Sequence, residues 1–162
     1  MTNKQISESE AKSRLSALCA QREHCSYEMI EKMQRWELSE EAQAMIMQYL
    51  TEHKFIDDER YARAMSIDKL RYNKWGRKKI EQALWQKHID SDIITHVLDE
   101  IDDDEYLSVL RPLLQSKRHS TKGKTEYEIN QKLIRFAFSR GYEYRLIRQC
   151  LDDVEEDVYQ DD

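Results

Sequence analysis

The sequence predicts an all-α protein made of three tandem three-helix repeats in an elongated, curved arrangement. Glycine and proline supply only 3 and 1 of the 162 residues, far below the roughly 12% of average usage. Apolar residues recur at i, i+3, i+4 and i+7 in many segments, and no long segment alternates with period two, which favours helices over strands. The same apolar pattern starts from Leu38, Ile89 and Tyr142, and such a return is typical of helical repeats.

The first predicted repeat covers residues 1–54. Ser7 with Glu10 has the spacing of a capping box, and Ser39 precedes another helix as a candidate N-cap. Apolar stripes predict the buried helix faces, namely Ala11, Leu15, Leu18 and Cys19, then Ala42, Met45, Ile46, Tyr49 and Leu50. A unit this small buries its own faces poorly, so we expect neighbouring repeats to stack on one another.

The second predicted repeat covers residues 55–101. Asp57 and Asp90 precede helices as candidate N-caps, and Gly76 marks a helix boundary. The last helix has an unbroken apolar stripe, formed by Ile94, Val97, Leu98 and Ile101. The acidic cluster over residues 99–105 lacks the glycine and ligand alternation of a calcium-binding loop. We therefore expect helix capping there rather than a metal site.

The third predicted repeat covers residues 102–157, and an acidic tail end follows at 158–162. Thr125 with Glu128 has capping-box spacing, and Gly141 marks a helix boundary. Pro112 lies inside a predicted helix over 103–118 and is expected to kink that helix or to end its first part. Residues 117–124 contain no apolar side chain, so we expect a mobile loop there.

The net charge of −6 is unevenly distributed along the chain. Residues 152–162 hold seven acidic residues and no Lys or Arg, so the preceding residues together carry a charge of +1. A near-neutral body leaves a polyanionic partner open, although the net charge alone argues against one. We hypothesise that the acidic tail lies on basic surface and screens it against nonspecific polyanions.

The sequence carries no pattern of a known catalytic or cofactor site. Walker, HExxH, GxSxG and GxGxxG motifs are missing, so we expect no enzymatic activity, no catalytic residue, no metal and no cofactor. Cys19, Cys25 and Cys150 show no CxxC spacing, which predicts reduced structural thiols. No apolar run approaches the roughly 18 residues of a membrane helix, and the first residues lack a signal-peptide core. We therefore expect a cytoplasmic protein without membrane contact.

Two basic patches are the candidate partner-binding sites. The first lies in residues 69–79, which contain no acidic residue and interleave Tyr72 and Trp75 with Lys69, Arg71, Lys74, Arg77, Lys78 and Lys79. The second consists of Lys117, Arg118, Lys122 and Lys124. Such segments can contact phosphates or an acidic groove of a protein. The alternative is a solvated helix face with Tyr72 and Trp75 turned inward.

The run Phe55-Ile56-Asp57-Asp58-Glu59-Arg60-Tyr61-Ala62 resembles the RecX family of regulatory proteins, modulators of the bacterial RecA recombinase. Other family-like segments are the basic stretch with Gly76, the helix around 80–84 and Arg140-Gly141-Tyr142, so the resemblance extends over residues 10–152. His88 stands where the family usually has glycine, so a left-handed helix end there would carry a side chain. Asp58 and Arg60 match the family run, and one interpretation is that they hold the first and second repeats together through an ion pair.

The resemblance implies a non-enzymatic protein that binds along the groove of the RecA filament on single-stranded DNA. Binding would inhibit filament extension, ATP hydrolysis and strand exchange, and so modulate DNA repair and recombination within the SOS response. We expect such a protein to act as a monomer. The alternative hypothesis is a helical DNA-binding protein that contacts single- or double-stranded DNA directly through residues 69–79.

Overall fold

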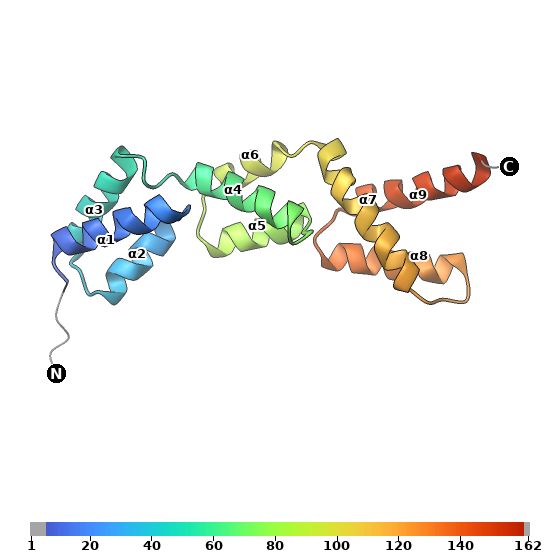
Figure 1. Ribbon diagram of the computed structural model, residues 1–162, viewed down its shortest axis with the longest axis horizontal. Helices are drawn as coiled ribbons and strands as arrows, with labels where there is room; N and C mark the ends of the chain where they lie inside the picture. Colours follow the sequence, from blue (N-terminus) through green and yellow to red (C-terminus); the bar gives the residue numbers. More distant parts are fainter. Residues whose placement is uncertain (1–5, 161–162) are drawn as a thin grey trace. The chain divides into compact units, whose positions relative to one another are not determined.

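The computed structural model describes residues 6–160 of the chain, with side chains over residues 6–152. The predicted acidic tail end and its screening role therefore fall outside the residues with described side chains. Residues 6–160 form nine helices and no strand, which confirms the all-α fold class. The helices are α1 (Glu8–Gln21), α2 (Ser26–Arg35), α3 (Glu40–Glu52), α4 (Asp58–Arg71), α5 (Arg77–Gln86), α6 (Ser91–Asp99), α7 (Asp103–Ser120), α8 (Glu126–Ser139) and α9 (Tyr144–Gln160) (Figure 1). Over the described part of the chain, none of them is both long and apolar enough to span a membrane.

The helices begin where the sequence predicts N-caps. The side chains of Ser7, Ser39, Asp57, Asp90 and Thr125 each accept a hydrogen bond from a backbone N–H two or three residues later, at 2.9–3.2 Å. Each bond satisfies a donor that the helix itself leaves unpaired, and such a cap contributes about 1 kcal/mol to stability. All five predicted caps are confirmed.

The chain packs as two compact units. Of the described residues, the first unit contains 6–65 and Leu84–Thr95, and the second contains Ser66–Ala83 and 96–160. The predicted repeat boundaries at 54/55 and 101/102 fall in the connections before α4 and α7. The assignment of three repeats with these boundaries stays a prediction.

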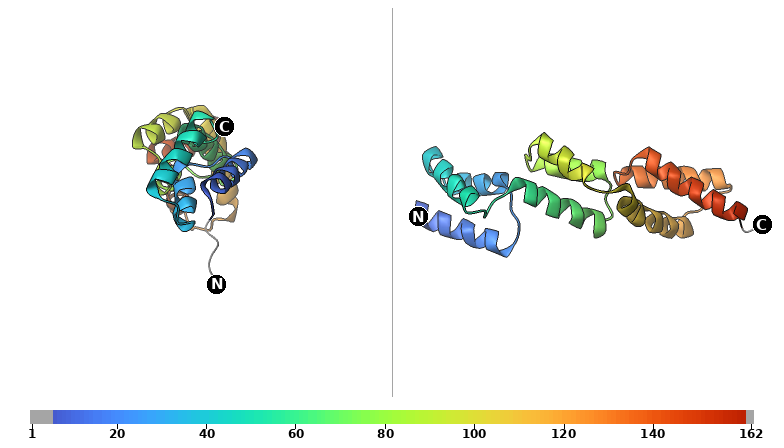
Figure 2. Two further views of the ribbon diagram at one scale, coloured as in Figure 1. Left: turned by 90° about the vertical axis from the view of Figure 1, so that its left-hand side faces the viewer. Right: turned by 90° about the horizontal axis from the view of Figure 1, so that it is seen from above.

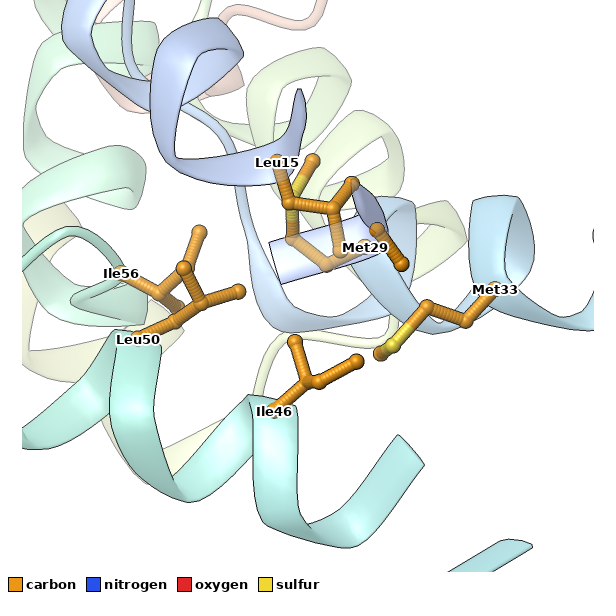
Figure 3. Close-up of a cluster of buried hydrophobic side chains, with 7 residues drawn as sticks. Leu15, Met29, Met33, Ile46, Leu50 and Ile56 are labelled. Carbon is orange, nitrogen blue, oxygen red and sulfur yellow. The ribbon is translucent and has the colours of Figure 1, made fainter. Parts of the chain in front are cut away.

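The first unit is held by an apolar cluster between α1, α2 and α3. Its buried members, each at most 3% exposed, are Ala11, Leu15, Met29, Met33, Ile46, Leu50 and Ile56. Figure 3 shows Leu15 from α1 and the two methionines from α2 facing Ile46 and Leu50 from α3. Full burial of such a side chain contributes roughly 1.5–3 kcal/mol, so this cluster is the main stabilising element of the unit.

Polar contacts in the first unit link the connection between α1 and α2 to the start of α4. The Asp58 carboxylate accepts a 2.8 Å hydrogen bond from the backbone N–H of Ser26, and Arg60 Nε lies 2.8 Å from Glu23 Oε1. The ion pair predicted for this region is confirmed for Arg60, with Glu23 as its partner, whereas Asp58 contributes a hydrogen bond to backbone instead. Because both side chains of that pair are more than one-third exposed, the pair contributes little to the free energy of unfolding. Its main effect is to hold the connection between α1 and α2 next to the start of α4.

The second unit depends on a backbone contact between two glycines. Gly76 donates its N–H to the carbonyl of Arg140 at 2.7 Å, and Lys78 donates to the carbonyl of Gly141 at 3.0 Å. A Cβ atom on Gly76 would lie 2.4 Å from the carbonyl carbon of Gly141. No side chain fits at that distance, so only glycine allows the start of α5 to meet the turn between α8 and α9. Figures 1 and 2 show α8 and α9 running side by side beyond this turn.

A residue with left-handed backbone follows each of α2, α5 and α8, the middle helices of the three predicted repeats. Glu37, His88 and Gly141 follow α2, α5 and α8 with φ angles of 56°, 56° and 95°. The left-handed conformation expected for His88 is confirmed. The histidine ring stacks on Tyr27, with ring centroids 4.1 Å apart, and this contact compensates for part of the strain that a side chain brings to such a position.

Two expectations for the third repeat are wrong in part. Helix α7 runs continuously over Asp103–Ser120, so Pro112 does not end it, and the kink expected as the alternative stays a prediction. Pro112 is exposed, so water can hydrate the carbonyl of Ser108 that loses its helical donor. Residues 117–120 belong to α7 and are not a loop, because basic side chains in the last turn complement the helix dipole. Residues 121–124 do lie in the connection between α7 and α8.

We predict that Gly141→Ala destabilises the protein by about 1–3 kcal/mol, because an alanine would be strained at φ 95° and its Cβ would lie 2.5 Å from the backbone N of Lys79. Chemical denaturation measures the change. The control is Glu37→Gly, which relieves a side chain from a left-handed position and should raise stability by about 0.5 kcal/mol. Equal stability of Gly141→Ala and the wild type would contradict the assignment.

The buried imidazole of His24 predicts a dependence of stability on pH. His24 is 3% exposed, and burial lowers its pKa; Glu28, with Oε1 3.7 Å from Nδ1, opposes this effect, while Arg22 and Lys32 add to it. The unfolded chain then takes up a proton below about pH 6.5 that the folded protein resists. The contribution of the neutral His24 to the free energy of unfolding is therefore fully present above that pH and is lost as the pH falls. Denaturation between pH 7.5 and about 5 should show a shallower decline for His24→Gln than for the exposed control His119→Gln.

Candidate partner-binding surface

The first predicted patch lies at the end of α4, in the following connection and at the start of α5. Lys69 Nζ and Lys79 Nζ lie 4.9 and 4.7 Å from the centroid of the Trp75 ring. Trp75 is half-buried, whereas Tyr72 is 79% exposed. The alternative with both aromatic rings turned inward is therefore wrong for Tyr72. Two cations held at one ring form a site that presents positive charge and an aromatic edge together.

A second group of the same kind surrounds Phe136 of α8. Lys117 Nζ from α7 lies 4.9 Å from the centroid of the Phe136 ring, and the guanidinium carbon of Arg140 lies 5.1 Å from it. Lys117 belongs to the second predicted patch, but Arg140 and Phe136 do not. In the sequence, Phe136 falls in an apolar stripe with Ile129, Leu133 and Ala137, which favours a core position.

The glycine contact brings these two groups together within the second unit. Arg140 accepts the hydrogen bond of Gly76, which directly follows Trp75, and Gly141 lies against the backbone and Cβ of Lys79. We call the combined set the cation–aromatic surface. It consists of Lys69, Trp75, Lys79, Lys117, Phe136 and Arg140. Four cations and two rings from the α4–α5 and α7–α8 segments thus share one region of the unit.

Arg77 points away from this surface and into the unit. Its guanidinium donates to Asp103 Oδ1 at 3.0 Å, to Glu143 Oε2 at 3.0 Å and to the carbonyl of Ile101 at 2.7 Å. The side chain is 17% exposed, and its hydrogen bond holds the pKa of Asp103 below the usual range. Arg77 therefore joins α5 to the starts of α7 and α9, and we leave it out of the candidate surface.

The other predicted cations of residues 69–79 are exposed. Arg71 forms a 2.9 Å ion pair with Glu105, and the ammonium of Lys74 donates to the carbonyl of Arg71. Lys78 has no ion-pair partner among the residues whose side chains are described. These three side chains border the cation–aromatic surface in sequence but make no contact with its rings that would hold them in one place.

The remaining cations of the second predicted patch are divided between structure and solvent. Arg118 donates to Asn130 Oδ1 at 2.8 Å and lies 3.6 Å from Glu126, so it ties α7 to α8. Lys122 and Lys124 are exposed in the connection between those helices. Of the four cations in this patch, only Lys117 thus contributes to the cation–aromatic surface.

The side chains of this surface are suited to binding an anionic partner. Ammonium and guanidinium groups recognise carboxylates and phosphates, and ring faces can stack on bases or pack on apolar side chains. The rings also restrict the lysine side chains before a partner arrives, which lowers the entropy lost on binding. A polyanion that also carries flat or apolar groups therefore fits best.

Comparisons with known proteins place this chain among helical regulators. Residues 57–98 match the family description "RecX, second three-helix domain", and residues 103–151 match "RecX, third three-helix domain". "Regulatory protein RecX" of Lactobacillus johnsonii is 31% identical over 137 residues, covering 84% of this chain and 50% of that protein. The protein of the same name from Acinetobacter baylyi is 28% identical over 153 residues, covering 94% of this chain and 93% of that protein.

Solved structures show the same fold. The crystal structure of RecX from Lactobacillus salivarius superposes with a TM-score of 0.83 at 18% identity, covering 91% of this chain and 96% of that chain. The chain spans about half the length of the Lactobacillus johnsonii and Clostridium relatives that it matches. The similarity therefore covers 93% of the Acinetobacter protein and about half of these longer relatives.

Arg77 and Lys78 test the distinction between a cation buried in the unit and a cation exposed on its surface. Arg77→Gln should lower the free energy of unfolding by about 2 kcal/mol, because Glu143 and the carbonyl of Ile101 would lose a donor whose side chain is only 17% exposed. Lys78→Gln, which removes the same charge one residue later, should change it by less than about 0.5 kcal/mol. Similar effects of the two substitutions in thermal or chemical denaturation would refute this division.

Proposed function

The chain belongs to the RecX family, and from this premise we propose that it is a non-enzymatic regulator that binds the filament of the RecA recombinase on single-stranded DNA. Bound there, it blocks filament extension and lowers ATP hydrolysis and strand exchange, which restrains DNA repair and recombination. The cation–aromatic surface is the contact region in this proposal. The family match carries the choice of partner, and the surface carries the choice of residues.

The composition of the cation–aromatic surface supports a nucleoprotein partner. Lys69, Lys79, Lys117 and Arg140 place four positive charges around two rings within one packed unit. A filament offers both phosphates and acidic protein side chains to such a surface. Opposite charges on two surfaces increase the rate of association and exclude like-charged partners. The net charge of −6 would oppose binding if it were evenly distributed, and its concentration in residues 152–162 avoids this.

Direct binding to DNA is the second candidate function. The exposed ring of Tyr72 and the half-buried ring of Trp75 lie among the cations of residues 69–79, and exposed rings next to cations favour single-stranded DNA. The two functions differ in their dependence on salt and on the recombinase. Binding to naked DNA through several phosphate contacts must weaken steeply as the salt concentration rises.

We expect the purified protein to reduce the ATPase activity of the cognate RecA on single-stranded DNA at stoichiometric or lower amounts. The double variant Lys69→Glu/Lys79→Glu should need about tenfold more protein for half-inhibition, because it places two like charges against the partner. The control is Lys122→Glu/Lys124→Glu, which changes the net charge equally on side chains outside the cation–aromatic surface. Circular dichroism establishes that both variants fold.

Three outcomes separate the candidates. Unchanged ATPase activity over a broad range of wild-type concentrations rejects a filament regulator. Inhibition that the control variant loses and the double variant keeps rejects the cation–aromatic surface as its contact. Steeply salt-dependent binding to naked DNA without any effect on the ATPase supports direct DNA binding in its place.

A further inference from the structure

Helix α8 carries an exposed aromatic stripe that the proposed function does not use. Tyr127 is 72% exposed and Phe138 is 58% exposed, and the half-buried Ile134 lies between them. These positions are separated by seven and four residues, so they fall on one side of the helix. The buried side of α8 is a different one, formed by Asn130, Leu133 and Ala137. We propose that this stripe is a docking site for an acidic amphipathic helix of a partner protein.

The apolar side chains of the stripe have the spacing that helix packing uses. Eleven residues separate Tyr127 from Phe138, a length of about 16 Å along the helix axis. Side chains three and four residues apart form ridges, and a partner helix with apolar residues at the same spacing fits between them. Large aromatic side chains are also the residues that most often dominate the energy of protein interfaces.

The charges beside the stripe determine the chemistry of the partner. Residues 129–142 contain no acidic residue, and the cation nearest to the stripe in that segment is Arg135, about 80° away around the helix. Arg135 is exposed, and it has no ion-pair partner among the residues with described side chains. A guanidinium next to an apolar stripe favours a carboxylate on the flank of the incoming helix.

The acidic residues near Tyr127 are already engaged within the unit. Glu126 lies 3.6 Å from Arg118, and Glu128 accepts the backbone N–H of Lys124 at 2.9 Å. They leave the C-terminal half of the stripe positive.

The stripe is separate from the cation–aromatic surface. Phe136, with Lys117 and Arg140 at its ring, lies on the opposite flank of α8 from Phe138, since two residues correspond to about 200° around a helix. A protein helix on the stripe therefore leaves that surface open. The inference does not depend on the recombinase as partner, and it can fail or hold independently of the proposed function.

The test uses the full chain and a labelled synthetic peptide of about 18 residues, helical, with Leu at every third or fourth position and Glu on both flanks. Fluorescence anisotropy should show saturable binding to the wild type, and Phe138→Ser should weaken it about tenfold. The matched control is Tyr72→Ser, which removes a more exposed aromatic ring of the same unit and should leave the affinity unchanged.

Exchanging charges on the peptide and on Arg135 distinguishes a specific site from nonspecific binding. The wild type should prefer the Glu-flanked peptide over the same peptide with Lys flanks, and Arg135→Glu should reverse that preference. An unchanged preference in Arg135→Glu, equal loss in Tyr72→Ser, or no binding of the Glu-flanked peptide up to about 1 mM would each overturn the proposal. So would protection of Tyr127 by a DNA oligonucleotide in place of the peptide.

Discussion

The contact between Gly76 and Gly141 is the constraint on which the second unit depends. It brings the start of α5 so close to the turn between α8 and α9 that backbone meets backbone. Tyr142, which follows directly, is fully buried and donates its hydroxyl to the carbonyl of Lys74 at 2.9 Å. A wider approach would remove this bond and the packing of the ring. The chain has only three glycines, and two of them are used here.

The same contact divides neighbouring cations between two tasks. One residue after Gly76, Arg77 enters a site where two carboxylates and a carbonyl replace its hydration, and a guanidinium tolerates this because its donors point in fixed directions. Two residues further on, Lys79 stays at the surface beside Trp75. Composition counts both as positive charge, but only the surface cation is available to a partner. The function of a basic segment thus depends on the direction of each side chain.

Local interactions explain which features the sequence could predict. N-caps such as Ser39 and Thr125 depend on atoms two or three residues away, and the left-handed conformation of His88 depends on the end of its own helix. The cation–aromatic surface instead depends on Arg140 meeting Gly76, residues far apart in the sequence. No periodicity encodes such a meeting. Pro112 shows the same limit, because its tolerance within α7 depends on which side of the helix faces water.

The left-handed ends of α2, α5 and α8 differ in what surrounds them, and this limits how these three helices could be exchanged for one another. Glu37 and His88 carry side chains at that position, whereas Gly141 has the backbone of Lys79 within 2.5 Å of where its Cβ would be. A turn taken from α2 or α5 therefore cannot replace the one after α8 without pushing α5 away. The three predicted repeats share one pattern of helices, but their helix ends cannot replace one another. Sequence divergence among the repeats is therefore most restricted at the turn after α8, because backbone atoms of Lys79 lie directly beside it.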